Sequence, residues 1–139
     1  MKAPAANHSN GSTTMKTRIL LSLAVLALAG PAFAAGPVKT VKSDKGNVVA
    51  AGNNGMTLYT FKNDTKGVSN CYDDCAKSWP PFIATSGAKA EGAYSLVSRK
   101  DGSKQWAKNG MPLYFWVKDM KQGDATGDGV KGVWDAARP

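Results

Sequence analysis

The most constraining feature of this sequence is an internal repeat with an offset of 55 residues. Residues 54–64 (NGMTLYTFKND) recur as residues 109–119 (NGMPLYFWVKD), with Asn, Gly, Met, Leu, Tyr and Asp at matching positions. The same offset relates Trp79 to Trp134. A fixed period of this length is the signature of one supersecondary unit that is used more than once. We therefore expect two related units that bury their apolar faces against each other.

Each copy is predicted to contain three short strands separated by turns. Residues 94–98, 103–107 and 111–117 carry the aromatic and β-branched side chains that are typical of strands, and Asn109-Gly110 is a common hairpin turn. The pattern predicts an all-β fold in which two antiparallel meanders, within residues 38–84 and 93–139, form a small sandwich or barrel of about eight strands. Seven aromatic side chains should supply much of its core: Tyr59, Phe61, Trp79, Trp106, Tyr114, Trp116 and Trp134.

The first 34 residues have the features of an export signal. Two basic residues precede an apolar run over residues 19–29, and Ala32-Phe33-Ala34 is a cleavage site of the A-x-A kind. The run is shorter than the roughly 20 apolar residues of a membrane-spanning helix. We predict a mis-assigned start at residues 1–14, a signal peptide at 15–34 and a single domain at 35–139. This domain should be periplasmic or extracellular, without a lipid anchor or a transmembrane segment.

Cys71 and Cys75 are predicted to form a disulfide, because exported proteins meet an oxidising compartment. In a regular helix, Cβ atoms four residues apart are separated by about 5–6 Å, which exceeds the roughly 3.5–4.5 Å of a disulfide. We therefore expect a distorted turn here, with one short helical turn before Pro80. The alternative is a redox-active or copper(I) pair, to which Met120 could add a soft sulfur ligand.

The composition excludes several classes of enzyme. His8 is the only histidine and lies before the predicted signal, so residues 35–139 cannot form a Ser-His-Asp or Cys-His site. Glu91 is the only glutamate, and nothing in the sequence marks two aspartates as a catalytic pair. We therefore expect that the protein is not an enzyme and has no cofactor, with copper as the alternative.

The charge balance indicates the kind of partner. Residues 35–139 carry 15 basic and 10 acidic side chains, a net charge of +5. Basic side chains cluster near residues 39–45 and again near residues 99–104, where Arg99 is the first. Basic surfaces of this kind attract anionic polymers, lipid head groups or acidic proteins. We expect a monomer whose partner is an envelope protein or an anionic polymer, and not nucleic acid.

The repeated Tyr-x4-Asp motif comprises Tyr59 and Asp64 in the first copy and Tyr114 and Asp119 in the second. Alternate residues of a strand share a face, so the aromatic residue two places after each tyrosine should join it in the core. Each carboxylate lies just beyond a strand, where it can accept hydrogen bonds from backbone N–H groups of the next turn. The alternative is a binding surface. Its candidate binding aromatics are Trp79, Trp106, Trp116 and Trp134.

These motifs resemble a family of predicted lipoproteins, or secreted repeat proteins of unknown function, that is defined by a Tyr-x4-Asp motif. The resemblance also rests on Cys71-x3-Cys75 before Trp79, on residues 99–106 (RKDGSKQW), and on residues 127–129 (GDG) before Trp134. It covers nearly all of residues 35–139. The chain departs from the family in two ways: it lacks the lipidated cysteine of many members, and Asp135 stands where members often carry histidine.

The resemblance implies an exported protein without a settled activity. Together with the residues, it favours a non-catalytic cell-envelope protein with a binding or structural role. The alternative is a periplasmic thiol or copper(I) protein that uses Cys71 and Cys75 in redox or metal handling.

Overall fold

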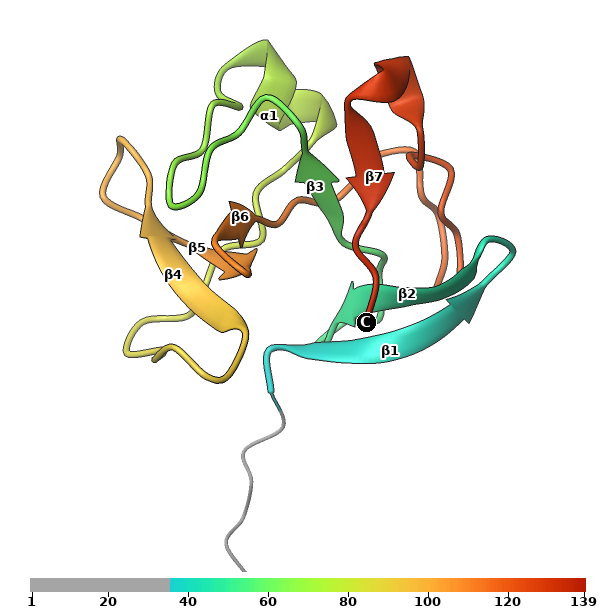
Figure 1. Ribbon diagram of the computed structural model, residues 1–139, viewed down its shortest axis with the longest axis horizontal. Coiled ribbons are helices and arrows are strands. Elements are labelled where there is room, and N and C mark those ends of the chain that lie inside the picture. The colour runs from blue at the N-terminus through green and yellow to red at the C-terminus, as the bar shows by residue number, and fades with distance from the viewer. Residues whose placement is uncertain (1–35) are drawn as a thin grey trace, which may run out of the picture. The chain divides into compact units, whose positions relative to one another are not determined.

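The computed structural model describes residues 36–139, and the predicted signal peptide and start extension lie outside the described residues. Antiparallel strands predominate, with one short α-helix beside the cysteine pair, which confirms the predicted fold class. No helix within residues 36–139 is long and apolar enough to cross a membrane. The elements in chain order (Figure 1) are β1 (Val38–Ser43), β2 (Gly46–Ala51), β3 (Tyr59–Phe61), α1 (Asp74–Ser78), β4 (Tyr94–Ser98), β5 (Lys104–Lys108), β6 (Met111–Pro112), the 3-10 helix η1 (Val130–Gly132) and β7 (Trp134–Ala136).

Each copy begins with a hairpin, as the turn residues predict. β1 pairs with β2, and β4, β5 and β6 form a three-stranded antiparallel sheet. Asn109 and Gly110 join β5 to β6 with φ values of 50° and 83°. Positive φ at both central residues is the requirement of a type I′ turn, which Asn-Gly meets at low cost. Pro112 lies on the edge strand β6, where its missing N–H breaks no inner ladder.

The third strand of each copy differs from the prediction, because its first residues pair with its own hairpin and its later residues pair with the other copy. β3 pairs with β7 (Figure 1). This pairing places Tyr59 opposite Ala136. A bridge between Tyr114 and Pro81 is the same pairing displaced by 55 residues. The predicted strand at 111–117 is therefore shortened to the two residues of β6, and β3 has only three residues. Three small sheets result, and no closed barrel forms among residues 36–139.

Backbone hydrogen bonds show an internal two-fold relation between the copies. Tyr59 N–H donates to the Tyr114 carbonyl at 2.8 Å, and Tyr114 N–H donates to the Tyr59 carbonyl at 2.9 Å. Phe82 N–H donates to the Leu113 carbonyl, and the residues at the same offset, Ala137 and Leu58, repeat this bond. The closing segment of each copy thus completes the other copy.

The interior divides into two apolar clusters on opposite sides of the strands. Leu58 and Leu113 contribute to one cluster, and the adjacent Tyr59 and Tyr114 contribute to the other, as the period of two along a strand requires. Trp106 packs with the leucines. The tyrosine cluster contains the remaining predicted core aromatics and is the one that reaches the candidate site: Trp79 and Trp134 are buried in it, and Phe61 and Trp116 are half-buried against it.

Candidate functional site

Four aromatic rings from both copies form one continuous stack. Trp134 lies between Phe61 and Trp79, with ring centroids 4.3 Å and 3.8 Å away and interplanar angles of 8° and 4°. Trp116 completes the stack on the other face of Trp79 at 4.0 Å and 25°. The repeat offset exchanges Phe61 with Trp116 and Trp79 with Trp134. This four-ring stack is therefore symmetric about its centre, and it exists only because the closing segments cross between copies.

The motif tyrosines support the stack from behind. Tyr59 meets Trp79 edge to face at 5.2 Å, and Tyr114 meets Trp134 in the same way at 5.2 Å. Such pairs contribute beyond the area that they bury, by roughly 0.5–1.5 kcal/mol each. Gly127 closes the packing, because a Cβ atom there would come within 2.7 Å of Cη2 of Trp79. The Trp79 indole is consequently packed at its outer edge as well as on its two faces.

A groove of about 520 Å³ runs over this stack, and all four rings line it. One wall comes from α1 in the first copy, and the other comes from η1 and its neighbours in the second copy. The walls occupy equivalent positions in the repeat but differ chemically, since Cys75 and Ser78 correspond to Val130 and Val133. In Figure 1, α1 and the red coil before β7 lie at the same end of the β3–β7 pair. The residues that line the stack groove are Phe61, Asn63, Asp74, Cys75, Ser78, Trp79, Trp116, Val130, Lys131, Val133 and Trp134.

The repeated motif forms crossed Tyr–Asp pairs beneath the groove. Tyr59 Oη donates to Asp119 Oδ2 at 2.5 Å, and Tyr114 Oη donates to Asp64 Oδ2 at 2.7 Å. Each tyrosine thus bonds to the aspartate of the other copy. The second oxygen of each carboxylate accepts a backbone N–H from the segment that follows it, from Asn70 at 2.7 Å for Asp64 and from the residue seven places after Asp119 at 3.0 Å. The predicted local bonds are present, and the bonds between copies are additional.

Burial fixes the protonation of the two motif phenols. Burial, together with the hydrogen bond to Asp119, raises the pKa of Tyr59 far above its usual value. Burial likewise raises the pKa of Tyr114, so both phenols remain hydrogen-bond donors at physiological pH. Burial also raises the pKa of Asp64, while hydrogen bonds from Tyr114 and Asn70 and the charge of Arg99 oppose the rise. The crossed pairs are suited to holding the copies together rather than to transferring protons.

Arg99 is buried, which contradicts its prediction as part of a surface basic cluster. Its guanidinium donates to Gln105 Oε1 at 2.8 Å, to the Cys71 carbonyl at 2.9 Å and to Ser69 Oγ at 3.0 Å. It also lies 4.2 Å from the ring centroid of Tyr72. Because these acceptors are buried, they draw the cation inward and leave only the lysines of that cluster exposed. Arg99 thereby ties the cysteine loop to the second copy.

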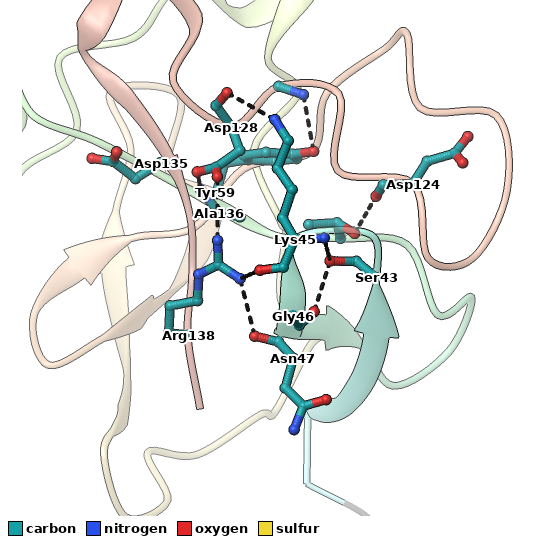
Figure 2. Close-up of polar contacts among 12 residues, drawn as sticks. Ser43, Lys45, Gly46, Asn47, Tyr59, Asp124, Asp128, Asp135, Ala136 and Arg138 are labelled. Carbon is teal, nitrogen blue, oxygen red and sulfur yellow. Dashed lines mark hydrogen bonds and ion pairs between the residues drawn. The ribbon is translucent and has the colours of Figure 1, made fainter.

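Part of the first basic cluster is also engaged in internal contacts (Figure 2). Lys45 Nζ donates to the Asp128 carbonyl at 3.3 Å, and Arg138 donates to the Lys45 carbonyl at 2.6 Å. Asp128 pairs with Arg138 at 3.2 Å and accepts the Ala136 N–H at 2.8 Å. These bonds tie the β1–β2 turn to β7. Lys39 and Lys42 remain exposed on β1.

Comparison with known families identifies the repeat. A family model described as a secreted repeat of unknown function matches residues 39–83 and, a second time, residues 95–138. This chain belongs to that family of secreted repeats. The finding confirms the resemblance seen in the motifs, and each match runs from the first strand of a copy to its closing segment. Searches of curated proteins and of solved structures find no match.

The predicted disulfide of this secreted repeat is present between Cys71 and Cys75, and residues 36–139 contain no free cysteine. The loop is distorted as predicted, because Asp73 adopts a φ of 52° before α1 begins. The copper(I) alternative requires both sulfurs as free ligands, whereas here they are bonded to each other. Its third candidate, Met120, is 83% exposed and does not line the stack groove. The described residues contain no group of three or more His, Cys, Asp or Glu side chains arranged to hold a metal.

Replacing both Cys71 and Cys75 with serine should leave the secreted repeat folded. The chain-entropy model gives about 2 kcal/mol for so short a loop, and we expect a loss of no more than about 2–3 kcal/mol in the free energy of unfolding. The second copy closes the equivalent segment without a bridge, with Thr126 and Val130 at the matching positions. Urea unfolding of the double variant and of dithiothreitol-reduced wild type should give similar midpoints. An unfolded double variant would show that the disulfide is required for folding.

Proposed function

We propose that this secreted repeat is a non-catalytic binding protein of the cell envelope and that the stack groove is its binding site. The observation that carries the proposal is the composition of the groove, to which each copy contributes two rings and one wall. A concave, largely apolar site with a few polar groups is the usual form of a ligand site. The description of the family as secreted supports an exported protein, which we propose lies in the periplasm or outside the cell. We further propose that it is a monomer.

The absence of catalysis is part of the proposal. The phenols nearest the groove are held as donors by their partner aspartates, and burial keeps their pKa values far above the range of a useful base. The charged groups that line the groove are Asp74 and Lys131, one on each wall. Such groups suit recognition of a partner. We expect this partner to be an anionic envelope polymer, with an envelope protein as the other outcome of the test.

The test fills the groove and measures binding to isolated envelope polymers. Ser78→Tyr places a bulky side chain on the α1 wall, and Ser86→Tyr places the same side chain in the linker between copies, outside the groove. We expect the first variant to bind at least about tenfold more weakly, a loss of about 1.4 kcal/mol, and the second to bind like wild type. Equal binding by all three proteins would refute the groove as the site.

The binding proposal and the thiol or copper(I) alternative predict different contents of free thiol and copper in the exported protein. A thiol count and metal analysis on the exported form should find no free thiol and no bound copper. Two free thiols with stoichiometric copper would replace the binding proposal with metal handling.

A further inference from the structure

Two largely buried indole N–H groups of the stack have no partner within residues 36–139. Trp79 and Trp134 are only 5% and 3% exposed. Their indole nitrogens make no hydrogen bond to a described residue. Every described side-chain nitrogen or oxygen that is fully buried does have a hydrogen-bond partner, so these two nitrogens are not fully buried. Each N–H therefore keeps a narrow opening to solvent. Because indole N–H is a donor only, each group is available to an acceptor from outside the protein.

The position of the opening follows from the stack. Neighbouring rings cover both faces of Trp79 and of Trp134, so that only the edges of these indoles are free. At Trp79, the far end of the six-membered ring packs against Gly127 in the interior. Both residues line the stack groove, and the internal two-fold relation turns the same edge of each ring toward it. We infer that both N–H groups point into the groove, side by side on rings 3.8 Å apart.

The charges around the groove favour an anionic acceptor. Lys131 lines the groove and takes part in none of the ion pairs among residues 36–139. Lys118 Nζ lies 5.6 Å from the ring centroid of Trp116, at one end of the stack. The carboxylate of the groove, Asp74, is already paired with Lys77 at 3.2 Å. The edges of aromatic rings are also positive, which adds to the attraction for an oxyanion.

The ligand must be larger than an ion and must carry donors of its own. The groove volume of about 520 Å³ falls in the range of small-molecule sites, roughly 300–1,000 Å³. Asp74 can only accept hydrogen bonds, while Asn63 and Ser78 can donate or accept them. A partner for this set needs hydroxyl groups beside its anionic group. A sugar ring that bears a carboxylate has both.

We propose that the stack groove binds a uronic acid unit of an acidic polysaccharide, with its carboxylate on the N–H groups of Trp79 and Trp134. The Lys131 ammonium supplies the opposite charge, and the wall residues Asn63, Asp74 and Ser78 bond the sugar hydroxyls. This assignment rests on the proposed binding function and adds to it the chemical class of the ligand.

The experiment follows the indole N–H signals of the exported protein by 15N NMR. Each of the four tryptophans gives one signal, which single Trp→Phe variants assign. The probes are a trimer of galacturonic acid, the neutral galactose trimer and a glycerol phosphate oligomer. We expect the galacturonic acid trimer to move the Trp79 and Trp134 signals and to leave that of Trp106, which lies in the other cluster, in place. Lys131→Gln should weaken binding by about tenfold, and the matched variant Lys89→Gln, an exposed lysine outside the groove, should bind like wild type.

The other outcomes separate the ligand class from the binding function. Equal shifts with the neutral trimer would overturn carboxylate recognition, and tighter binding of the glycerol phosphate oligomer would assign the site to phosphate. Shifts at Trp106 alone would overturn the placement in the groove. If no probe moves an indole signal while Ser78→Tyr still weakens binding of envelope polymers, the uronic acid assignment is wrong and the binding function stands.

Discussion

Replacing Trp79 with alanine should lower the free energy of unfolding by about 3–5 kcal/mol, the usual cost of truncating a large aromatic core side chain. The indole packs face to face on Trp134 at 3.8 Å and on Trp116 at 4.0 Å, and it meets the edge of Tyr59. Alanine would leave a cavity in the middle of the stack and separate the rings of the two copies. Urea unfolding followed by circular dichroism measures the loss.

The matched control is Trp116→Ala at the end of the stack. Trp116 is half-buried and stacks on a single ring, Trp79, so its truncation should cost less than half as much. Trp134→Ala, which occupies the other inner position, should behave like Trp79→Ala. If Trp79→Ala unfolded at the wild-type midpoint, the stack would not be part of the core.

The second large effect is expected for Arg99→Met, which should also cost about 3–5 kcal/mol, as removal of one partner from a buried charged network does. Methionine keeps much of the side-chain length but leaves the Gln105 and Cys71 oxygens without their donor. It also removes the positive charge that favours ionised Asp64. Arg138→Met, which removes an arginine from a partly exposed ion pair, is the control and should cost about 1 kcal/mol or less.

The cost of Arg99→Met should depend on pH. Burial raises the pKa of the Asp64 carboxyl in the folded protein above its value in the unfolded chain. The stability that Asp64 contributes is therefore fully present below the unfolded pKa and is lost as pH rises through the folded pKa. Without Arg99 the folded pKa rises further. The deficit of the variant should therefore be smallest below about pH 4, the ordinary value for aspartate, and should increase toward neutral pH. If Arg99→Met lowered the free energy of unfolding by the same amount at every pH between about 3 and 7, the coupling to Asp64 would be contradicted.

Local chemistry predicted much of this fold. Asn109-Gly110 gave the correct hairpin, and the spacing of Cys71 and Cys75 predicted a disulfide with a distorted turn. The repeat offset predicted that two equivalent units share a core. Which strand pairs with which was not predictable, because a period of two identifies the buried face of a strand and not its partner. The exchange of β3 and the closing segments therefore emerged only from the structure.

The candidate site was predicted in part. The sequence predicts four candidate binding aromatics, of which Trp79, Trp116 and Trp134 line the groove, whereas Trp106 lies in the opposite cluster. Their stacking depends on the exchange between copies, so no local pattern could reveal it. Arg99 was misassigned to the surface because a basic residue beside a Lys-Asp-Gly turn is ordinarily solvated, and its buried acceptors are distant in sequence.

The exchange between copies is tested most directly by two double-mutant cycles that share Tyr59→Phe. With Asp119→Asn, the aspartate of the other copy, the coupling energy should be about 1–3 kcal/mol, because the two side chains share a buried hydrogen bond. With Asp64→Asn, the aspartate of the same motif, it should stay within about 0.5 kcal/mol. A large coupling to Asp64 and none to Asp119 would mean that each motif closes on itself, and the crossed arrangement that builds the groove would be wrong.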